Sequence, residues 1–316
     1  MGGARRALRV STAVAVGVFD GLHRGHGQLI ERARALAAGG RCVAVSFDPH
    51  PDLVLAKEFR ALPPLTPLPE KHDRLAALGV ELHVLPFTRE LAALSPEAFV
   101  DTHIVRPYAP QWLVVGEDFA LGKGRAGNVG RLTQIGSARG FGVESVPLLL
   151  AGGAPVSSSR IRGLLADGRI TEANALLGRA YSLVGLVVHG DQVGRKLGYP
   201  TANLRLHDEK QVPANGIYAV WARVAGEARW RMGAMSIGVR PTFGGQVRTL
   251  EVHLLDFAGD LYGADLEVRF VAWQRPELRF ENAQALVEAM GRDVLEARQH
   301  LTAQGIPAAD PDVAGA

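Results

Sequence analysis

The sequence of 316 residues contains a single cysteine, Cys42. One cysteine excludes an intramolecular disulfide framework, and its place in the apolar run Cys42–Phe47 predicts a buried strand residue. No apolar run reaches the roughly 18 residues that a membrane-spanning helix needs. The apolar run that follows Arg5, Arg6 and Arg9 is typical of a first strand and not of a signal peptide. A cytoplasmic protein with no membrane partner is therefore expected.

An excess of charge of either sign is also missing. The 35 lysines and arginines nearly balance the 32 aspartates and glutamates, which leaves a net charge of +3. This balance, and the lack of a stripe that combines aromatic with basic residues, argue against a nucleic-acid partner. The length and the hydrophobic content of 47% suit a soluble protein of two domains. No internal repeat is found, and we expect a monomer or a weak homo-oligomer.

Strand and helix patterns alternate through the first half of the chain. The apolar runs that predict strands are Ala13–Val18, Cys42–Phe47, Leu82–Phe87, Gln111–Val115 and Gly142–Leu149. The patterns between them that predict helices are Gln28–Ala38, Leu68–Leu78, Ser95–Ile104 and Arg131–Arg139. This alternation predicts an α/β fold with a parallel, doubly wound sheet, which binds its ligands beyond the carboxyl ends of the strands.

A glycine-rich turn with two histidines, Gly17–His26, joins the first predicted strand to the first predicted helix. The backbone N–H groups and the positive end of the helix dipole favour a bound anion there. His23 and His26 add donors for phosphate oxygens, and the glycines let a ligand approach the backbone. A histidine at a helix start also caps the helix without any ligand. The combination of two histidines, glycines and a preceding strand favours a nucleotide phosphate site.

Other segments of the first half carry polar residues near predicted element ends. Asp48–Pro51 and Gly116–Gly127 each follow a predicted strand, so the parallel topology brings them to the edge that holds the two-histidine turn. Farther along, Ser157–Ser159 and Arg162 open a predicted helix. The serines serve as helix caps in the simpler interpretation, and with the arginine they form a grip for phosphate.

The second half changes to short strands without helices between them, after a helical connector at Arg169–Tyr181. The runs that predict strands are Leu183–His189, Gly216–Val224, Trp230–Ile237, Leu250–Phe257 and Leu266–Trp273. This spacing predicts an antiparallel barrel or sandwich. A helix at Asn282–Gln304 follows, with one apolar face formed by Leu286, Met290, Val294, Ala297 and Leu301. The segment Ile306–Ala316 is small and rich in proline and alanine, and we expect it to be disordered.

Three positions of the second half carry candidate chemistry. The segment Gly190–Leu204 combines glycines with a basic pair and either wraps a phosphate or forms a surface loop. Within it, Thr201 and Asn203 offer neutral oxygen ligands suited to magnesium that arrives with nucleotide phosphates, or simply form a turn. Glu251 shares a strand face with His253 and Leu255. That face is either solvated or lines a pocket, where the carboxylate is a candidate base for a hydroxyl that attacks a phosphoryl group.

On these residues the chain resembles the bacterial bifunctional riboflavin kinase/FAD synthetase family over nearly its whole length. The matching segments are Gly17–His26, Phe47–Pro51, Leu65–Lys71, Val115–Gly127, Ser157–Arg162, Gly185–Leu204 with its Pro-Thr-Ala-Asn, Gly238–Phe243, Leu250–Tyr262, and the last helix with Asp293 and Arg298. The resemblance implies a Rossmann-like nucleotidyltransferase domain at residues 1–167, a connector at 168–181, and a riboflavin kinase β-barrel with a C-terminal helix at 182–305. Residues 306–316 are the expected disordered tail.

The resemblance implies two reactions, in which ATP phosphorylates riboflavin to FMN and then adenylylates FMN to FAD with release of pyrophosphate. The implied catalytic residues are Glu251, His23 and His26. The implied ATP-binding residues of the first domain are Gly17, Phe19, Asp20, Gly21, His23, Gly25, His26, Ser157, Ser158, Ser159 and Arg162. The implied FMN-binding residues there are Asp48, Pro49, His50, Asp118, Phe119 and Arg125. In the kinase domain, the implied ATP- and flavin-binding residues are Gly190, Gly194, Arg195, Lys196, Gly198, Pro200, Thr201, Asn203, Arg240 and Thr242. Mg²⁺ enters as Mg–ATP, and Thr201 and Asn203 are its implied ligands.

The chain departs from the common family pattern at four positions. Val18 stands where asparagine is frequent, Asp48 replaces a frequent glutamate, and Ala120 and Leu121 replace a bulkier pair near the expected flavin site.

Three other functions are weighed against the two-site enzyme. The first is an FMN adenylyltransferase whose barrel binds flavin without catalysis, although such a barrel would not need Glu251 as a base. The second is a flavin- or RNA-binding regulatory protein without turnover. The third is a metal site formed by His23, His26 and His50, for which no carboxylate or cysteine ligand occurs at a suitable spacing.

Overall fold

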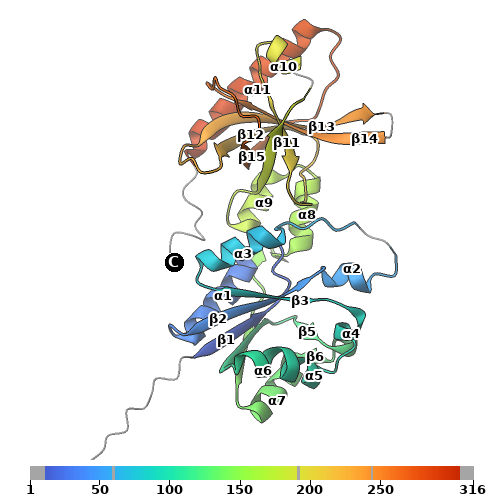
Figure 1. Cartoon of the computed structure of the whole chain (residues 1–316), viewed down its shortest axis with the longest axis vertical. Coiled ribbons are helices and arrows are strands. Elements are labelled where there is room, and N and C mark those ends of the chain that lie inside the picture. Colours follow the sequence, from blue (N-terminus) through green and yellow to red (C-terminus); the bar gives the residue numbers. More distant parts are fainter. Residues whose placement is uncertain (1–10, 59–60, 191–192, 243–244, 307–316) are drawn as a thin grey trace, which may run out of the picture. The chain divides into compact units, whose positions relative to one another are not determined.

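The computed structural model describes residues 11–58, 61–190, 193–242 and 245–306 (Figure 1). These residues pack into two compact units. The first holds the described residues up to Leu62 and those from Thr66 to Ser157, and the second holds Pro63–Leu65 and the described residues from Ser158 onward. The expected tail lies outside the described residues from Pro307 onward.

The first unit is built on a parallel five-stranded sheet in the order β3-β2-β1-β4-β7. Its strands are β1 (Thr12–Val16), β2 (Arg41–Asp48), β3 (Glu81–Pro86), β4 (Trp112–Gly116) and β7 (Gly142–Val146). Helical elements connect and cover these strands: α1 (Arg24–Ala37), α2 (Pro51–Leu55), α3 (Leu68–Ala77), α4 (Arg89–Ala92), α5 (Pro96–Val100), the π-helix η1 (Asp101–Val105), α6 (Arg106–Tyr108), the 3₁₀ turn η2 (Lys123–Arg125) and α7 (Val129–Arg139). Two small hairpins pair β5 (Ala120–Leu121) with β6 (Gly127–Asn128) and β8 (Leu150–Ala151) with β9 (Ala154–Pro155).

The central strands are buried on both faces, which is why they are continuous apolar runs. In β1, Val14 and Val16 pack in a core with Ile104 and Leu132, from the side of η1 and α7. Ala13 and Ala15 pack in the other core, with side chains of α1 and α3. The sheet is therefore covered on both faces, and the predicted doubly wound arrangement is confirmed.

The second unit begins with α8 (Ser158–Ala166) and α9 (Ile170–Leu177) and continues into a closed antiparallel barrel. The barrel order is β10-β11-β14-β13-β12-β15. Its elements are β10 (Ser182–Val188), α10 (Val193–Lys196), β11 (Ala202–Leu206), β12 (Gly216–Val224), β13 (Arg231–Thr242), β14 (Gly245–Leu254) and β15 (Asp265–Arg275). The long helix α11 (Ala283–Gln304) packs Ala297 and Leu301 against Ala219 and Trp221 of β12. The barrel and the terminal helix agree with the prediction.

Several element bounds differ from the prediction: β13 and β14 begin or end several residues away from the predicted runs, β7 ends at Val146, and the predicted helix Ser95–Ile104 divides into α5 and η1. Two further differences have a clear physical reason. The strand β11 occupies Ala202–Leu206 and begins within the segment Gly190–Leu204, which the sequence predicted either to wrap a phosphate or to form a surface loop. β11 pairs with β10 on one side and β14 on the other. These hydrogen bonds make a strand of a short segment whose hydrophobic alternation is weak. Helix α1 starts at Arg24 and not at Gln28, because the His23 side chain caps it earlier.

Candidate active sites

The two histidines of the glycine-rich turn stack on one another at the start of α1. Their ring centroids are 3.7 Å apart and the rings are inclined by 15°. The His26 backbone N–H donates to His23 Nδ1 over 3.3 Å, which makes His23 the N-cap of α1. An Nδ1 that accepts carries no proton, so the neutral His23 ring has its N–H at Nε2. His23 can therefore cap α1 through Nδ1 and still offer its Nε2–H as a hydrogen-bond donor.

Other candidate residues of this turn fix its conformation. Phe19 is fully buried and stands edge-on to the His26 ring, with centroids 5.4 Å apart. Asp20 is only 3% exposed, and its Oδ1 accepts a hydrogen bond from the Thr66 backbone N–H over 3.1 Å. A Cβ on Gly25 would lie 3.3 Å from His23 Nδ1, so glycine gives the imidazole room against the backbone. Gly17 and Gly21 lie in the same turn, where Gly21 has a φ of 81°.

The FMN candidates of the first unit follow β2 and β4, the two neighbours of β1 in the sheet. Asp48 ends β2, and His50 caps α2 by accepting from the Asp52 N–H over 3.1 Å. Because these parallel strands are adjacent, their carboxyl ends bring the candidates and the two-histidine turn to one edge of the sheet. Pro49 lies between Asp48 and His50 and is exposed.

Asp118 and Phe119 follow β4 and lead into the β5–β6 hairpin. Arg125 Nη2 donates to the Asp118 carbonyl oxygen over 3.0 Å, which draws the two ends of this segment together. The hairpin rests on the residues before α5, because the Lys123 N–H donates to Leu94 O over 2.8 Å. Ala120 and Leu121, which replace a bulkier pair of the family pattern, form the strand β5.

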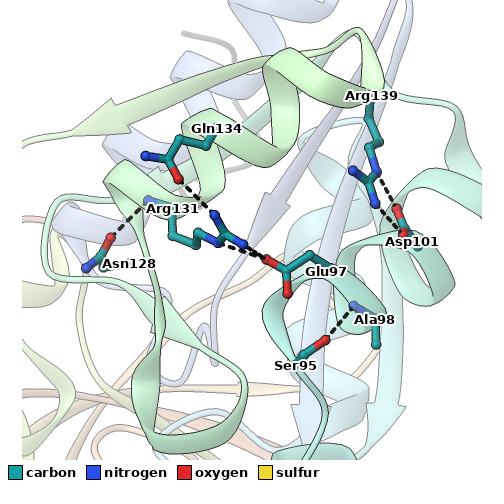
Figure 2. A network of polar contacts seen from close by, with 8 residues as sticks. All are labelled: Ser95, Glu97, Ala98, Asp101, Asn128, Arg131, Gln134 and Arg139. Carbon is teal, nitrogen blue, oxygen red and sulfur yellow. Dashed lines mark hydrogen bonds and ion pairs between the residues drawn. The ribbon is translucent and has the colours of Figure 1, made fainter.

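A network of charged side chains joins α7, which leaves this hairpin, to α5 and η1 (Figure 2). Arg131 pairs with Glu97 at 2.7 Å, and two turns later Arg139 makes a bidentate contact with Asp101. Asn128, the last residue of β6, caps α7 through the Arg131 N–H. The network thereby fixes α7, and with it the end of β6, against α5 and η1.

The serine and arginine candidates divide between the units. Ser157 ends the first unit, and Ser158, Ser159 and Arg162 belong to α8 of the second. Arg162 Nε donates to the Pro63 carbonyl oxygen over 3.3 Å, within the second unit.

The barrel brings together Asn203 of β11, Glu251 of β14 and Thr201, which immediately precedes β11. Thr201 Oγ1 donates to Glu251 Oε2 over 3.1 Å, and Asn203 of β11 lies directly opposite Glu251 of β14. Arg240 Nη2 approaches Glu251 Oε1 at 3.5 Å. The candidate base is thus held between a hydroxyl and a guanidinium. Thr242 ends β13, and its side chain lies outside the described part of the structure.

Two candidate glycines leave space for the proposed magnesium ligands. A Cβ on Gly190 would lie 2.4–2.6 Å from the carboxamide atoms of Asn203. A Cβ on Gly194 would lie 2.4 Å from Tyr199 O and 3.5 Å from Thr201 Oγ1. The glycines therefore act in the folded barrel by letting Asn203 and the Thr201 region lie against the loop backbone. Arg195 and Lys196 end α10, both exposed, and Gly198 has a φ of 87°.

Two cavities meet at Thr201. One, of about 300 Å³, contains Glu251, and its wall includes apolar side chains of the segment before α11 and of α11 itself. The other, of about 540 Å³, is lined by Arg195, Pro200 and Tyr262 among others. Thr201 lines both. The first cavity combines apolar side chains with the charged groups of Glu251, Arg275, Glu277 and Asp293, whereas the second is lined mainly by apolar side chains, with Arg195 and Asp260 as its charged lining residues.

Sequence reasoning missed several residues of the first cavity. The missed lining residues include Tyr199, Arg275, Glu277, Leu278 and Phe280. Leu286, Met290 and Val294 were predicted as an apolar helix face, and they line the cavity, whereas Ala297 and Leu301 of that face are core. Asp293 of the same helix is buried and makes a bidentate pair with Arg275 of β15 at 2.6–2.7 Å. The available signal for this ion pair was Asp293 itself, an acidic residue on an otherwise apolar helix face, because a buried charge requires a partner.

His253 occupies the same strand face as Glu251 and also lines the first cavity. Its Nδ1 lies 2.8 Å from the Pro200 carbonyl oxygen, an acceptor, so Nδ1 carries the donated proton. This bond ties the residue before Thr201 to the strand of Glu251.

Across the described ranges, no three His, Cys, Asp or Glu side chains are arranged to hold a metal ion. The available donors are the neutral oxygens of Thr201 and Asn203, which suit a magnesium ion that brings phosphate ligands of its own. In the part of the chain that the structure describes, no helix is both long and apolar enough to cross a membrane.

The first unit has a parallel sheet with a two-histidine turn, and the second has a barrel in which Thr201 lines two cavities and donates to the carboxylate of Glu251. Together they define a two-domain enzyme that transfers phosphorus-containing groups. Comparison with known proteins agrees. The FAD synthetase family model matches residues 6–160, and the riboflavin kinase family model matches residues 177–301. The chain belongs to the family of bifunctional riboflavin kinase/FMN adenylyltransferases.

Curated relatives of that name include a protein of Listeria monocytogenes, 37% identical over 92% of this chain and 92% of the relative. The relative from Escherichia coli K12 is 38% identical over 93% of this chain and 94% of the relative. A crystal structure described as a macrolide-efflux protein from Streptococcus pneumoniae superposes with a TM-score of 0.85 at 30% identity, covering 92% of this chain and 94% of that one.

Proposed function

We propose that the chain carries out both reactions of its family, each in its own domain. The barrel phosphorylates riboflavin with ATP to give FMN, and the parallel-sheet domain adenylylates FMN with ATP to give FAD and pyrophosphate. The observation that carries the kinase assignment is Thr201, which lines both cavities and hydrogen bonds to Glu251. A barrel that only bound flavin would not need a carboxylate held by the threonine that the two cavities share.

In the kinase reaction, the terminal ribityl hydroxyl of riboflavin gives its proton to Glu251. The hydroxyl oxygen attacks the γ-phosphorus of ATP, and ADP leaves. Thr201 orients the carboxylate through its hydrogen bond. Thr201 and Asn203 are the residues that would hold Mg²⁺, which supplies charge neutralisation at the phosphates. Gly190, Gly194, Arg195, Lys196, Gly198, Pro200, Arg240 and Thr242 are the proposed binding residues around them.

In the adenylyl transfer, a phosphate oxygen of FMN attacks the α-phosphorus of ATP, and pyrophosphate leaves. The attacking phosphate is already an anion, so the step needs no base. His23 and His26 donate to phosphate oxygens where negative charge increases. Asp48, Pro49, His50, Asp118, Phe119 and Arg125 are the proposed FMN residues. A triphosphate grip by Ser157, Ser158, Ser159 and Arg162 stays a prediction from the sequence.

The proposed functional boundaries are residues 1–167 for the adenylyltransferase and 182–305 for the kinase, with 168–181 as connector. We further propose that the protein acts in the cytoplasm as a monomer or weak homo-oligomer, on riboflavin, FMN and ATP alone. The small net charge of +3 supports the lack of a polyanionic partner. Light scattering of the purified chain tests the oligomeric state.

Flavin chromatography tests the two reactions directly. The protein is incubated with riboflavin, ATP and Mg²⁺, and in a parallel reaction with FMN, ATP and Mg²⁺. FMN followed by FAD is expected in the first reaction, and FAD in the second. FAD from FMN without any conversion of riboflavin would support the single-activity adenylyltransferase and refute the kinase assignment.

A further inference from the structure

The turn that carries the two histidines has an unusual backbone. Phe19 and Leu22 have φ values of 52° and 40°, a region that side chains with a Cβ rarely adopt. Gly21 between them has a φ of 81°. Such a conformation persists only where surrounding contacts determine it, and it occurs preferentially at functional sites.

Two buried side chains hold the backbone carbonyl of Val18, the second residue of this turn. Lys71 of α3 donates from Nζ to the Val18 carbonyl oxygen over 2.9 Å. Ser46 of β2 donates from Oγ to the same oxygen over 2.8 Å, and Lys71 Nζ lies 3.3 Å from Ser46 Oγ. Lys71 thus joins a helix, a neighbouring strand and the turn through a single ammonium group.

Burying a charged group at this position costs free energy. Lys71 is 6% exposed and Ser46 is fully buried. Burial lowers the pKa of the Lys71 ammonium, and the charges of Asp20 and Asp48 oppose that shift only in part. Both acceptors of Lys71 are neutral oxygens. A methionine would fill a similar volume without removing a charge from water, so packing alone does not favour lysine here.

We propose that Lys71 is a positioning residue for adenylyl transfer, which fixes the Val18 carbonyl and thereby the turn that presents His23 and His26. Being buried, it acts through the backbone and not on the substrate. The inference rests on the adenylyltransferase function proposed above, and it adds a residue outside the two-histidine turn and the candidate binding residues.

The test compares Lys71→Met with wild type and with Lys57→Met, which removes an exposed lysine of the same unit. For Lys71→Met we expect kcat for FAD formation from FMN to fall by about tenfold to a hundredfold, because a small displacement of the histidines disrupts alignment. KM for ATP is expected to change less than kcat, and riboflavin phosphorylation to stay at the wild-type rate. The melting temperature is expected to be unchanged or higher. Hydrogen exchange is expected to speed up at the amides of residues 17–23. Lys57→Met should match wild type in every measurement.

The outcomes separate this inference from the proposed function. Wild-type protein that makes no FAD from FMN refutes the adenylyltransferase function itself. An active wild type with an equally active Lys71→Met refutes only the positioning role, as does a fall in both activities together with the melting temperature. If Lys71→Met does not fold, Ser46→Ala decides, since it removes the other donor to Val18. A lower kcat at unchanged melting temperature then supports the role of the shared carbonyl contact, and an unchanged kcat overturns it.

Discussion

Thr201 and Glu251, fifty positions apart in the chain, are joined by a hydrogen bond of 3.1 Å between Thr201 Oγ1 and Glu251 Oε2. The bond exists because β11 and β14 are adjacent in the barrel, with Ala202 opposite Val252 and Asn203 opposite Glu251. The proposed base therefore lies beside both proposed magnesium ligands, Asn203 on the neighbouring strand β11 and Thr201 immediately before it.

Replacing Glu251 by glutamine tests the base. The amide keeps the shape and the hydrogen bond from Thr201 but accepts no proton, so riboflavin phosphorylation should fall by about a hundredfold or more. FAD formation from FMN should be unchanged, because the reaction belongs to the other domain. Steady-state rates for both reactions on one preparation provide the measurement. Equal loss of both activities in a folded protein would argue against two separate sites.

His26→Ala should produce the opposite pattern, with FAD formation reduced by about a hundredfold and FMN formation intact. His23 allows a finer comparison because it also caps α1. Both His23→Asn and His23→Ala remove the ring donor, but asparagine keeps a capping oxygen. We expect similar loss of activity in the two variants, with the alanine variant less stable by about 1 kcal/mol. An asparagine variant with wild-type activity would show that His23 serves only as a cap.

Gly190→Ala tests the packing of the loop on Asn203. The added methyl would occupy the space of the Asn203 carboxamide, so kinase activity should fall by about tenfold or more through displacement of that group. Gly226→Ala is the matched control. Its φ of 83° makes alanine strained, but nothing lies within 4 Å of the added carbon. The control should lose about 1 kcal/mol of stability and keep both activities. Kinase rates that fall equally in both variants would contradict the specific contact.

Cys42 should be unreactive in the folded protein. Burial in β2 raises the pKa of its thiol to about 11, so at pH 8 roughly one molecule in a thousand holds a thiolate. Alkylation by iodoacetamide, followed by mass spectrometry, should be slow until denaturant is added. Because the folded thiol keeps its proton more tightly than the unfolded one, stability should decrease as the pH rises from about 9 toward 11. Rapid alkylation of native protein at pH 8 would contradict a buried thiol.

Much of the fold follows from local patterns in the sequence. The strands of the first sheet are continuous apolar runs because both faces are covered, and such runs are readily recognised. The strand β11 was not recognisable in this way. Its five residues follow glycines and a proline, and only pairing with β10 and β14 makes them a strand.

A candidate site could be predicted where its residues lie close together in the sequence. The two-histidine turn combines its residues within a single strand-to-helix junction. Glu251 was ambiguous between a solvated and a pocket face, because only the barrel's closure and α11 decide what lies over that face. For the same reason, the apolar stripe of α11 could not be divided in advance into Met290, which lines a cavity, and Leu301, which is core. Lys71 lies in the matching segment Leu65–Lys71, but its contacts could not be predicted, since its partners are a carbonyl and a serine from other elements.

Thr201, as a wall shared by two cavities, has a consequence for inhibitor design. A compound that joins a tricyclic ring to an adenosine through a polyphosphate would place one end in each cavity across a single threonine. Once one end is bound, the other is present at a high effective concentration, so the tethered molecule should bind far more tightly than either half. Enlarging residue 201 would weaken both halves at once, and among the candidate barrel residues whose side chains the structure describes, Thr201 alone lines both cavities.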